Sequence, residues 1–276
     1  MKYPRTASEA AGRMDLRNRE KLERSPGSYF RGRARELVLA APYFRDRLRT
    51  NSYGGTATAH FHNLCAASYV AMLSAFEVMW KALFAGVVNA TDLYDENIVD
   101  HSRLRDVVTT EGVLAHRDEA SAGGVIAGSL GTWQRSDTVN ENFKAAFKVE
   151  PIAKSEASST DQLWQIRHVV AHGSGVIGAL DSYRLKGAIA SGEALVIDRD
   201  YLEFAEGQLK RAADNGVARV AAKILKDFFS QRSTGSWAED AEEFSSLFLL
   251  GVLVGPRQEL PDVSEDDYDN SRADLA

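Results

Sequence analysis

The sequence from Ala59 to Val88 constrains the fold more than any other part of the chain. Apolar side chains occupy almost every turn of a helix drawn through this segment and cover much of its circumference. A helix that is apolar on most sides must be buried on most sides, so other helices have to surround it. Glu77 is an acid in the middle of this run. The segment therefore predicts an all-α bundle built around one central helix.

Further helices are expected before and after this one. Ser121–Gly131 is rich in glycine and is predicted to be a loop, although it lacks the lysine of a phosphate-binding loop. Apolar periodicity and capping signals predict the other helices. These are a short helix over Ala34–Arg49 with a boundary or kink at Pro42, helices over Ile98–Val108 and Val139–Val149, and a long helix from Asp198 or Asp200 to about Phe229.

Arg167 and His172, with four residues between them, stand near the end of a predicted short helix, Asp161–His172. Capping residues over 159–161 precede that helix, and Gly173 supplies its C-terminal stop. An arginine can hold a phosphate by two charge-assisted hydrogen bonds, and a histidine can transfer a proton near neutral pH. The pair has the minimum chemistry needed to cleave a ribose phosphodiester without a metal.

This Arg-X4-His arrangement resembles the signature of the HEPN superfamily, over roughly residues 60–230. The resemblance implies a HEPN-like helical bundle with extra N-terminal helices and a loop or small β-hairpin after the signature helix. It implies a metal-independent endoribonuclease, without a cofactor, in which Arg167 holds the phosphate and His172 transfers protons. The RNA products would carry 2′,3′-cyclic phosphate and 5′-hydroxyl ends. The expected setting is toxin–antitoxin or anti-phage defence.

Two more residues are candidates for supporting roles. In the HEPN family the residue after the arginine is usually polar and assists the site, which implies a role for His168. Some members place an acidic residue from an earlier helix near the pair, and Glu77 fits that position. Alternatively, His168 is a surface histidine, or a zinc ligand with His172 one turn away, although no third ligand is evident. Glu77 could instead pair with Lys81 at i+4.

Residues five apart on a helix differ by about 140° around its axis, so Arg167 and His172 do not share one face. HEPN proteins commonly dimerise so that two signature helices form one composite cleft, which implies a homodimer here. Val169, Val170 and Val176 would suit such an interface or an intrachain core. The alternative is a non-catalytic HEPN dimerisation or binding module, or a regulatory subunit of a defence or toxin–antitoxin complex. Fixing Arg167 to a core carboxylate would favour the binding module.

The two ends of the chain differ in charge. Residues 1–50 hold 13 Lys and Arg against 6 Asp and Glu, whereas residues 234–276 hold 2 against 11. The basic end could contact RNA, and the acidic tail could bind an antitoxin or regulatory protein, or both could simply be solvated. We expect a basic arm or short helices over 1–56, the HEPN-like domain over 57–232, an apolar docking segment over 233–258 and a disordered acidic tail over 259–276.

Localisation follows from what the chain lacks. Its first residues show no basic-then-apolar signal pattern, and Cys65 is its single cysteine, so an internal disulfide is excluded. We therefore expect a soluble, cytoplasmic protein that does not contact a membrane.

Overall fold

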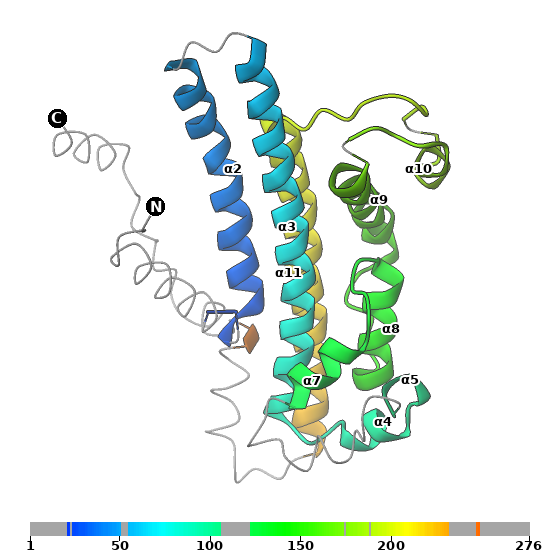
Figure 1. Ribbon diagram of the computed structural model, residues 1–276. Helices are drawn as coiled ribbons and strands as arrows, with labels where there is room; N and C mark the ends of the chain where they lie inside the picture. The colour runs from blue at the N-terminus through cyan, green and yellow to red at the C-terminus, as the bar shows by residue number, and fades with distance from the viewer. Residues whose placement is uncertain are drawn as a thin grey trace, which may run out of the picture.

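The computed structural model describes residues 21–22, 24–50, 55–105, 122–173, 175–187, 189–231 and 247–248, and in these the chain is all-α, which confirms the predicted fold class (Figure 1). The helices are α2 (Pro26–Thr50), α3 (Gly55–Ala90), α4 (Asp95–Asp100), α5 (Ser102–Arg105), α7 (Ala122–Ser129), α8 (Ser136–Phe147), α9 (Lys154–His172), α10 (Ala179–Arg184) and α11 (Arg199–Gln231).

The central helix α3 confirms the strongest prediction and is slightly longer than expected. Helices α2 and α11 lie beside it along most of its length, α7 crosses one end, and α8 and α9 form a second layer (Figure 1). Three aromatic residues one turn apart on α3 reach that layer. Phe76 contacts Trp164 at 5.5 Å between ring centroids, Trp80 contacts Phe143 at 5.9 Å, and Phe84 contacts Phe147 at 5.0 Å. These buried ring contacts fix α8 and α9 against α3.

The prediction of short helices near the N-terminus is wrong, because 26–50 form one continuous helix, α2. Pro26 occupies its first position, where the missing N–H costs nothing. Phe30, Ala34, Val38 and Ala41 are buried at helical spacing. This packing carries the helix through Pro42 despite the local cost of an internal proline. The segment predicted as an arm therefore supplies a full helix of the bundle, while residues 1–20 lie outside the described part.

The glycine-rich segment Ser121–Gly131, predicted to be a loop, contains helix α7. Its Gly123 packs directly on the backbone of α3, so that a Cβ atom there would lie 2.2 Å from the carbonyl oxygen of Ala85. The Gly123 N–H also donates a hydrogen bond of 2.8 Å to the Asn89 side chain. The glycine permits close approach of two helices rather than a turn.

The remaining helical predictions are confirmed in type and corrected in extent. The helix predicted over Ile98–Val108 is two short helices, α4 and α5, separated at His101, and residues 106–121 lie outside the described part. Helix α8 begins earlier than Val139 and ends at Phe147. Helix α11 begins as predicted, with the Tyr201 N–H donating to the Asp198 carboxylate at 2.8 Å. Gly216 does not interrupt α11; it lies against the Trp80 ring.

Leu247 and Phe248 are the described part of the apolar segment predicted over 233–258. Both are helical and buried, and Leu247 packs beside Gly86 of α3. Leu247 therefore docks on the central helix. The other residues of that segment and the acidic tail over 259–276 lie outside the described part.

One helix in the described ranges, over His60–Ala90, is long and apolar enough by these two criteria to cross a membrane. The central helix of a soluble bundle meets the same criteria, and α2, α7, α9 and α11 pack against this one. Length and composition therefore do not by themselves indicate a membrane span.

Glu156 fastens the first turn of α9 to α11. Its carboxylate accepts hydrogen bonds from the Ala153 N–H at 3.1 Å, from Arg219 at 3.0 Å and from the Asn215 amide. Burial alone would raise the pKa of this carboxyl group, but the hydrogen bonds from Asn215, Arg219 and Ala153 outweigh burial and lower it. The folded protein therefore favours the ionised form.

We expect Glu156→Gln to lower the free energy of unfolding by about 1–2 kcal/mol at pH 7. A lowered pKa in the folded state stabilises the protein above the ordinary value of 4.5, and this contribution is lost as the pH falls through the folded-state pKa. The difference between wild type and variant should therefore shrink in acid. Urea denaturation at pH 7 and at about pH 3.5 measures it, and an equal difference at both pH values would contradict this account.

Candidate functional site

Helix α9, which carries the Arg-X4-His motif, begins at Lys154 rather than at the predicted Asp161. The predicted capping residues lie inside the helix, where the Ser159 and Thr160 hydroxyls donate to the carbonyl oxygen of Glu156. Asp161 instead accepts the Ser136 N–H at 2.8 Å and so caps the neighbouring helix α8. The capping prediction was wrong because the acceptor serves another helix.

The predicted end of α9 is confirmed at His172. Gly173 follows, and its N–H donates to Val169 at 2.8 Å. Its φ of −101° is one that any residue adopts, and the left-handed conformation falls on Gly175, with φ of 81°. A side chain at Gly173 would instead crowd the carbonyl oxygens of Val169 and Val176. Close packing, rather than a left-handed backbone, therefore favours glycine at position 173.

After α9, where a loop or small β-hairpin is expected, residues 176–185 and 193–197 contain little extended structure. Val176 and Ala194 form an isolated antiparallel bridge, and the Ile177 N–H donates to Glu193 at 2.9 Å. Helix α10 then occupies most of the first segment. Within the described residues, a single β-bridge therefore stands in place of the expected small β-hairpin.

Tyr69 positions α9 against the central helix. Its buried hydroxyl donates a hydrogen bond of 2.7 Å to the carbonyl oxygen of Leu163, one turn before Arg167. Burial raises the pKa of Tyr69, so the phenol stays protonated and remains a donor at any physiological pH. The backbone that carries the motif is therefore fixed to α3.

Arg167 is half-buried and makes no hydrogen bond or ion pair with any residue that the structure describes. Its Nε atom is enclosed and has no acceptor. A buried guanidinium nitrogen without a partner is uncommon, because the lost hydration is not replaced. The carboxylate of Glu77 does not serve it. Arg167 is therefore a cation that the described fold leaves without a counter-ion.

His168 and His172 lie together on another side of α9. Both side chains are exposed, and their ring centroids are 4.9 Å apart. They stand one turn apart, whereas Arg167 is about 140° from His172 around the helix axis. The structure thus brings the two histidines together and does not place Arg167 on their face.

Glu77 forms the ion pair with Lys81 that was considered as the alternative to a role in the site. Lys81 donates to one carboxylate oxygen at 2.9 Å, and the Gln134 amide donates to the other at 2.9 Å. The carboxylate is mostly buried within this arrangement. Gln134 also lines the cleft beside α9, so among the described residues it is the hydrogen-bond partner that connects Glu77 to that cleft.

A cleft of about 570 Å³ adjoins the face of α9 that carries His168. Its lining side chains come from the segment before α8, from α9 and from the end of α10. They are Thr132, Gln134, Arg135, Ser158, Asp161, Gln162, Trp164, Gln165, His168, Arg184 and Lys186.

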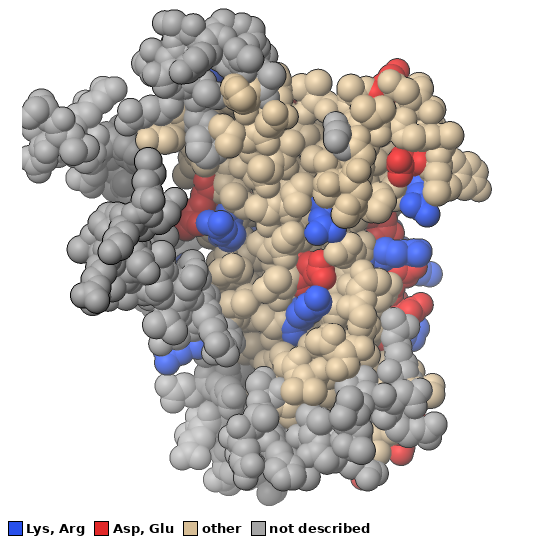
Figure 2. Space-filling view, viewed as in Figure 1, with Lys and Arg blue, Asp and Glu red and all other residues tan. Residues whose placement is uncertain are grey.

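The cleft is rich in positive charge. Three cations, Arg135, Arg184 and Lys186, line it together with one carboxylate, Asp161, whose Oδ1 atom accepts the Ser136 N–H. Arg135 also forms an exposed ion pair of 2.6 Å with Asp137, which does not line the cleft. On the face shown in Figure 2, charged side chains of both signs lie along the edge over α8 and α9, and others of both signs lie among the uncharged residues of the middle. The sequence carries no local signal for this cleft, because its cations come from separate segments.

No group of three His, Cys, Asp or Glu side chains that could hold a metal gathers within the described ranges. Cys65 is buried, and this burial, reinforced by the Asp198 carboxylate, raises the pKa of its thiol to about 11. The thiol is therefore protonated at neutral pH, consistent with a structural cysteine.

No protein-family model matches the chain, and searches of the curated proteins and of the solved structures find no match. The residues of α9 and of the adjoining cleft are therefore the features of the molecule that bear on its function.

Proposed function

We propose that the protein is a metal-independent endoribonuclease of the HEPN type. The observation that carries the proposal is the Arg167 guanidinium, which has no carboxylate partner in the described fold and is carried by the same helix, α9, as two exposed histidines. A guanidinium available in this way suits a phosphate, because it can donate two parallel hydrogen bonds to phosphate oxygens. The adjoining cations favour a polyanionic substrate.

The reaction needs a base, an acid and a cation. The base accepts the proton of the 2′-hydroxyl, the 2′-oxygen attacks phosphorus, and the bond from phosphorus to the 5′-oxygen breaks. The acid donates a proton to that 5′-oxygen, which leaves a 2′,3′-cyclic phosphate and a 5′-hydroxyl. His172 is the proposed proton-transfer residue, His168 supports it, and Arg167 stabilises the charge on the phosphorane. This scheme uses no metal or cofactor.

The proposed active form is a homodimer, since Arg167 and His172 lie on different sides of α9. A two-fold contact between the ends of two α9 helices would let the arginine of one protomer complement the histidines of the other. Val169 is buried within the protomer, so it belongs to the intrachain core. Val176 is half exposed and remains available for such a contact.

One observation that would favour the alternative, a non-catalytic binding module, is missing from the described residues. That alternative would be favoured by an Arg167 fixed to a core carboxylate, and the carboxylate considered for this, Glu77, is bound to Lys81 and Gln134 instead. The proposed setting of the nuclease is a cytoplasmic toxin–antitoxin or anti-phage defence system. An antitoxin or regulatory protein is the proposed partner of the acidic tail.

The first experiment is cleavage of total RNA, and separately of tRNA, by the full chain in EDTA. We expect fragments with 5′-hydroxyl ends, which accept phosphate from polynucleotide kinase without prior dephosphorylation, and with 3′ ends blocked by a cyclic phosphate. Fragments with 5′-phosphate ends, or cleavage only after Mg²⁺ is added, would contradict the mechanism. A dimer that binds RNA but does not cut it would favour the binding module.

A further inference from the structure

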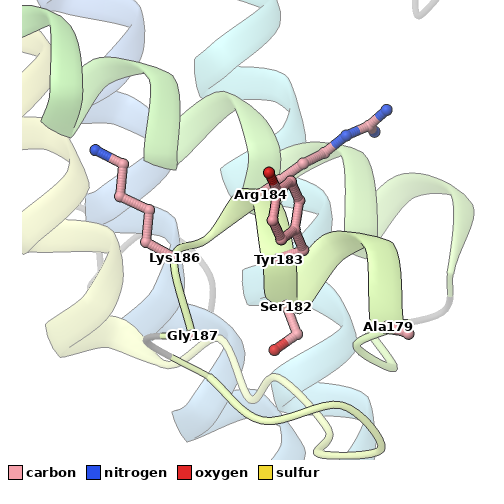
Figure 3. Close-up of a pocket in the computed structure, with 6 residues that line it drawn as sticks. All are labelled: Ala179, Ser182, Tyr183, Arg184, Lys186 and Gly187. Atoms are coloured by element: carbon pink, nitrogen blue, oxygen red, sulfur yellow. The ribbon is translucent and has the colours of Figure 1, made fainter.

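Two concave surfaces meet at α10. The first is the cleft beside α9. The second is shallower and more open, with a volume of about 700 Å³, and is lined by Ala179, Ser182, Tyr183, Arg184, Lys186 and Gly187 (Figure 3). Arg184 and Lys186 line both surfaces. The two surfaces therefore adjoin at these two cations, and we refer to them together as the path.

The cations at this junction are not used by the described fold. Arg184 and Lys186 are exposed, and neither forms an ion pair with a described residue. Figure 3 shows their side chains extending in opposite directions from α10 and the turn that follows it. The charged ends are thus spread along the path, as successive phosphates of one strand would require.

The backbone at Lys186 adds to this observation. Its φ is 55°, in the left-handed region that favours glycine, and Gly187 follows with φ of 72°. A lysine at such a position carries a conformational cost that a glycine would avoid. The turn ends α10, with the Gly187 N–H donating to the carbonyl oxygen of Ser182 at 2.9 Å, so it fixes the place where the Lys186 side chain leaves the helix.

Tyr183 is the aromatic element of the path. Its side chain is 81% exposed, and Figure 3 shows its ring standing out from α10 next to Arg184. Bases of single-stranded nucleic acids stack on exposed aromatic rings, with little dependence on sequence. Trp164 also lines the cleft, but it is 4% exposed and forms the floor rather than a stacking surface.

We propose that Tyr183, Arg184 and Lys186, with Arg135 of the cleft beside α9, form a binding track for single-stranded RNA. The phosphates bind along the three cations, one base stacks on Tyr183, and the strand passes His168 on its way to His172. An unpaired strand is required because a base inside a duplex cannot stack on Tyr183. This inference rests on the proposed ribonuclease function and names the conformation of its substrate.

Binding to an uncleavable strand tests the track separately from catalysis. The probe is a fluorescent 2′-O-methyl oligoribonucleotide of about 20 nucleotides, which has no 2′-hydroxyl to attack the phosphate and spans more than one binding site. Anisotropy is measured in EDTA with the full chain, against the same strand in a duplex. The charge variant is Arg184→Gln with Lys186→Gly, because glycine keeps the left-handed turn. The matched control is Lys210→Ala with Arg211→Ala, two exposed cations on α11.

We expect the charge variant to bind the single strand about 10- to 30-fold more weakly near 0.1 M salt, and the slope of log K against log salt to fall by about 1.4. The α11 control should change binding by less than about threefold. Tyr183→Ala should weaken binding about 5- to 10-fold, whereas Tyr183→Phe, which keeps the ring, should stay within about twofold of wild type.

Three results would overturn the track. They are a charge variant no weaker than the α11 control, a wild type that binds the duplex as tightly as the single strand, and α10 variants that change the oligomeric state but not oligonucleotide binding. The last would make α10 a protein interface. Cleavage of unmodified RNA separates the two proposals. If wild type cuts RNA and the α10 variants bind the oligonucleotide normally, only the proposed track is wrong. If wild type binds the oligonucleotide through α10 but does not cut RNA, only the proposed ribonuclease activity is wrong.

Discussion

His172→Ala is expected to lower the initial rate of RNA cleavage in EDTA by at least about 100-fold. Without the imidazole, neither the 2′-hydroxyl nor the leaving 5′-oxygen has its proton-transfer partner. The side chain is exposed at the end of α9, so its removal leaves the core intact and the variant should fold as wild type does. Quantitative gel analysis of a labelled RNA, with circular dichroism of both proteins, gives the rate and the folding check.

Two further variants make the result specific. Arg167→Lys keeps the charge but cannot donate two parallel hydrogen bonds, so it should be slowed at least about tenfold. His60→Ala removes an exposed histidine on α3 and should cleave at the rate of wild type. Cleavage by His172→Ala at the wild-type rate, or equal losses in His172→Ala and His60→Ala, would remove His172 from the mechanism.

Gly123→Val is expected to lower the free energy of unfolding by at least about 3 kcal/mol. The Cβ atom would lie 2.2 Å from the carbonyl oxygen and 2.7 Å from the Cα atom of Ala85, and these are backbone atoms that no rotamer change can move away. Helix α7 would have to withdraw from α3, which would expose Ile126 and Ala127 to water. Urea denaturation measures the loss.

Gly128 offers the matched control on the same helix. A Cβ atom there meets no other atom within 4 Å, so Gly128→Ala should raise the free energy of unfolding by about 0.5–1 kcal/mol through higher helix propensity. Opposite signs at the two glycines would show that contact with α3, rather than helix propensity, governs Gly123. A Gly123→Val protein as stable as wild type would contradict the packing described here.

The central helix and α11 could be predicted from the sequence because their signals are local. Apolar residues surround α3 on most sides, and Asp198 caps α11 beside an apolar stripe. The predictions for α2 and α7 failed where tertiary packing outweighs local preference. Pro42 and Gly123 have poor helix propensity, yet Ala41 is buried in the core and Gly123 rests on Ala85.

Some features of the candidate site could likewise be predicted from the sequence, and others could not. The end of α9 at Gly173 and the separation of Arg167 from His172 around the helix follow from the sequence and from helix geometry. The role of Asp161 as a cap for α8 could not be predicted from the sequence, because its partner Ser136 lies on another helix. The cleft could not be predicted either, since Arg135 meets Arg184 and Lys186 only after α8, α9 and α10 have packed together.

Helix α10 buries none of its own side chains, in contrast to α3. It is held mainly at its ends, by buried Ile177 and Leu185, and by side-chain hydrogen bonds of 2.8 Å from Gln165 to Asp181 and from Ser182 to the carbonyl oxygen of Ile189. Its opening therefore costs only a small part of the free energy that unfolds the bundle. Backbone amides of α10 should exchange with deuterium long before those of α3. Helix α10, which forms one wall of the cleft, can thus open and reclose while the bundle stays folded. A long ligand can then enter the cleft from the side, without passing one of its own ends through it.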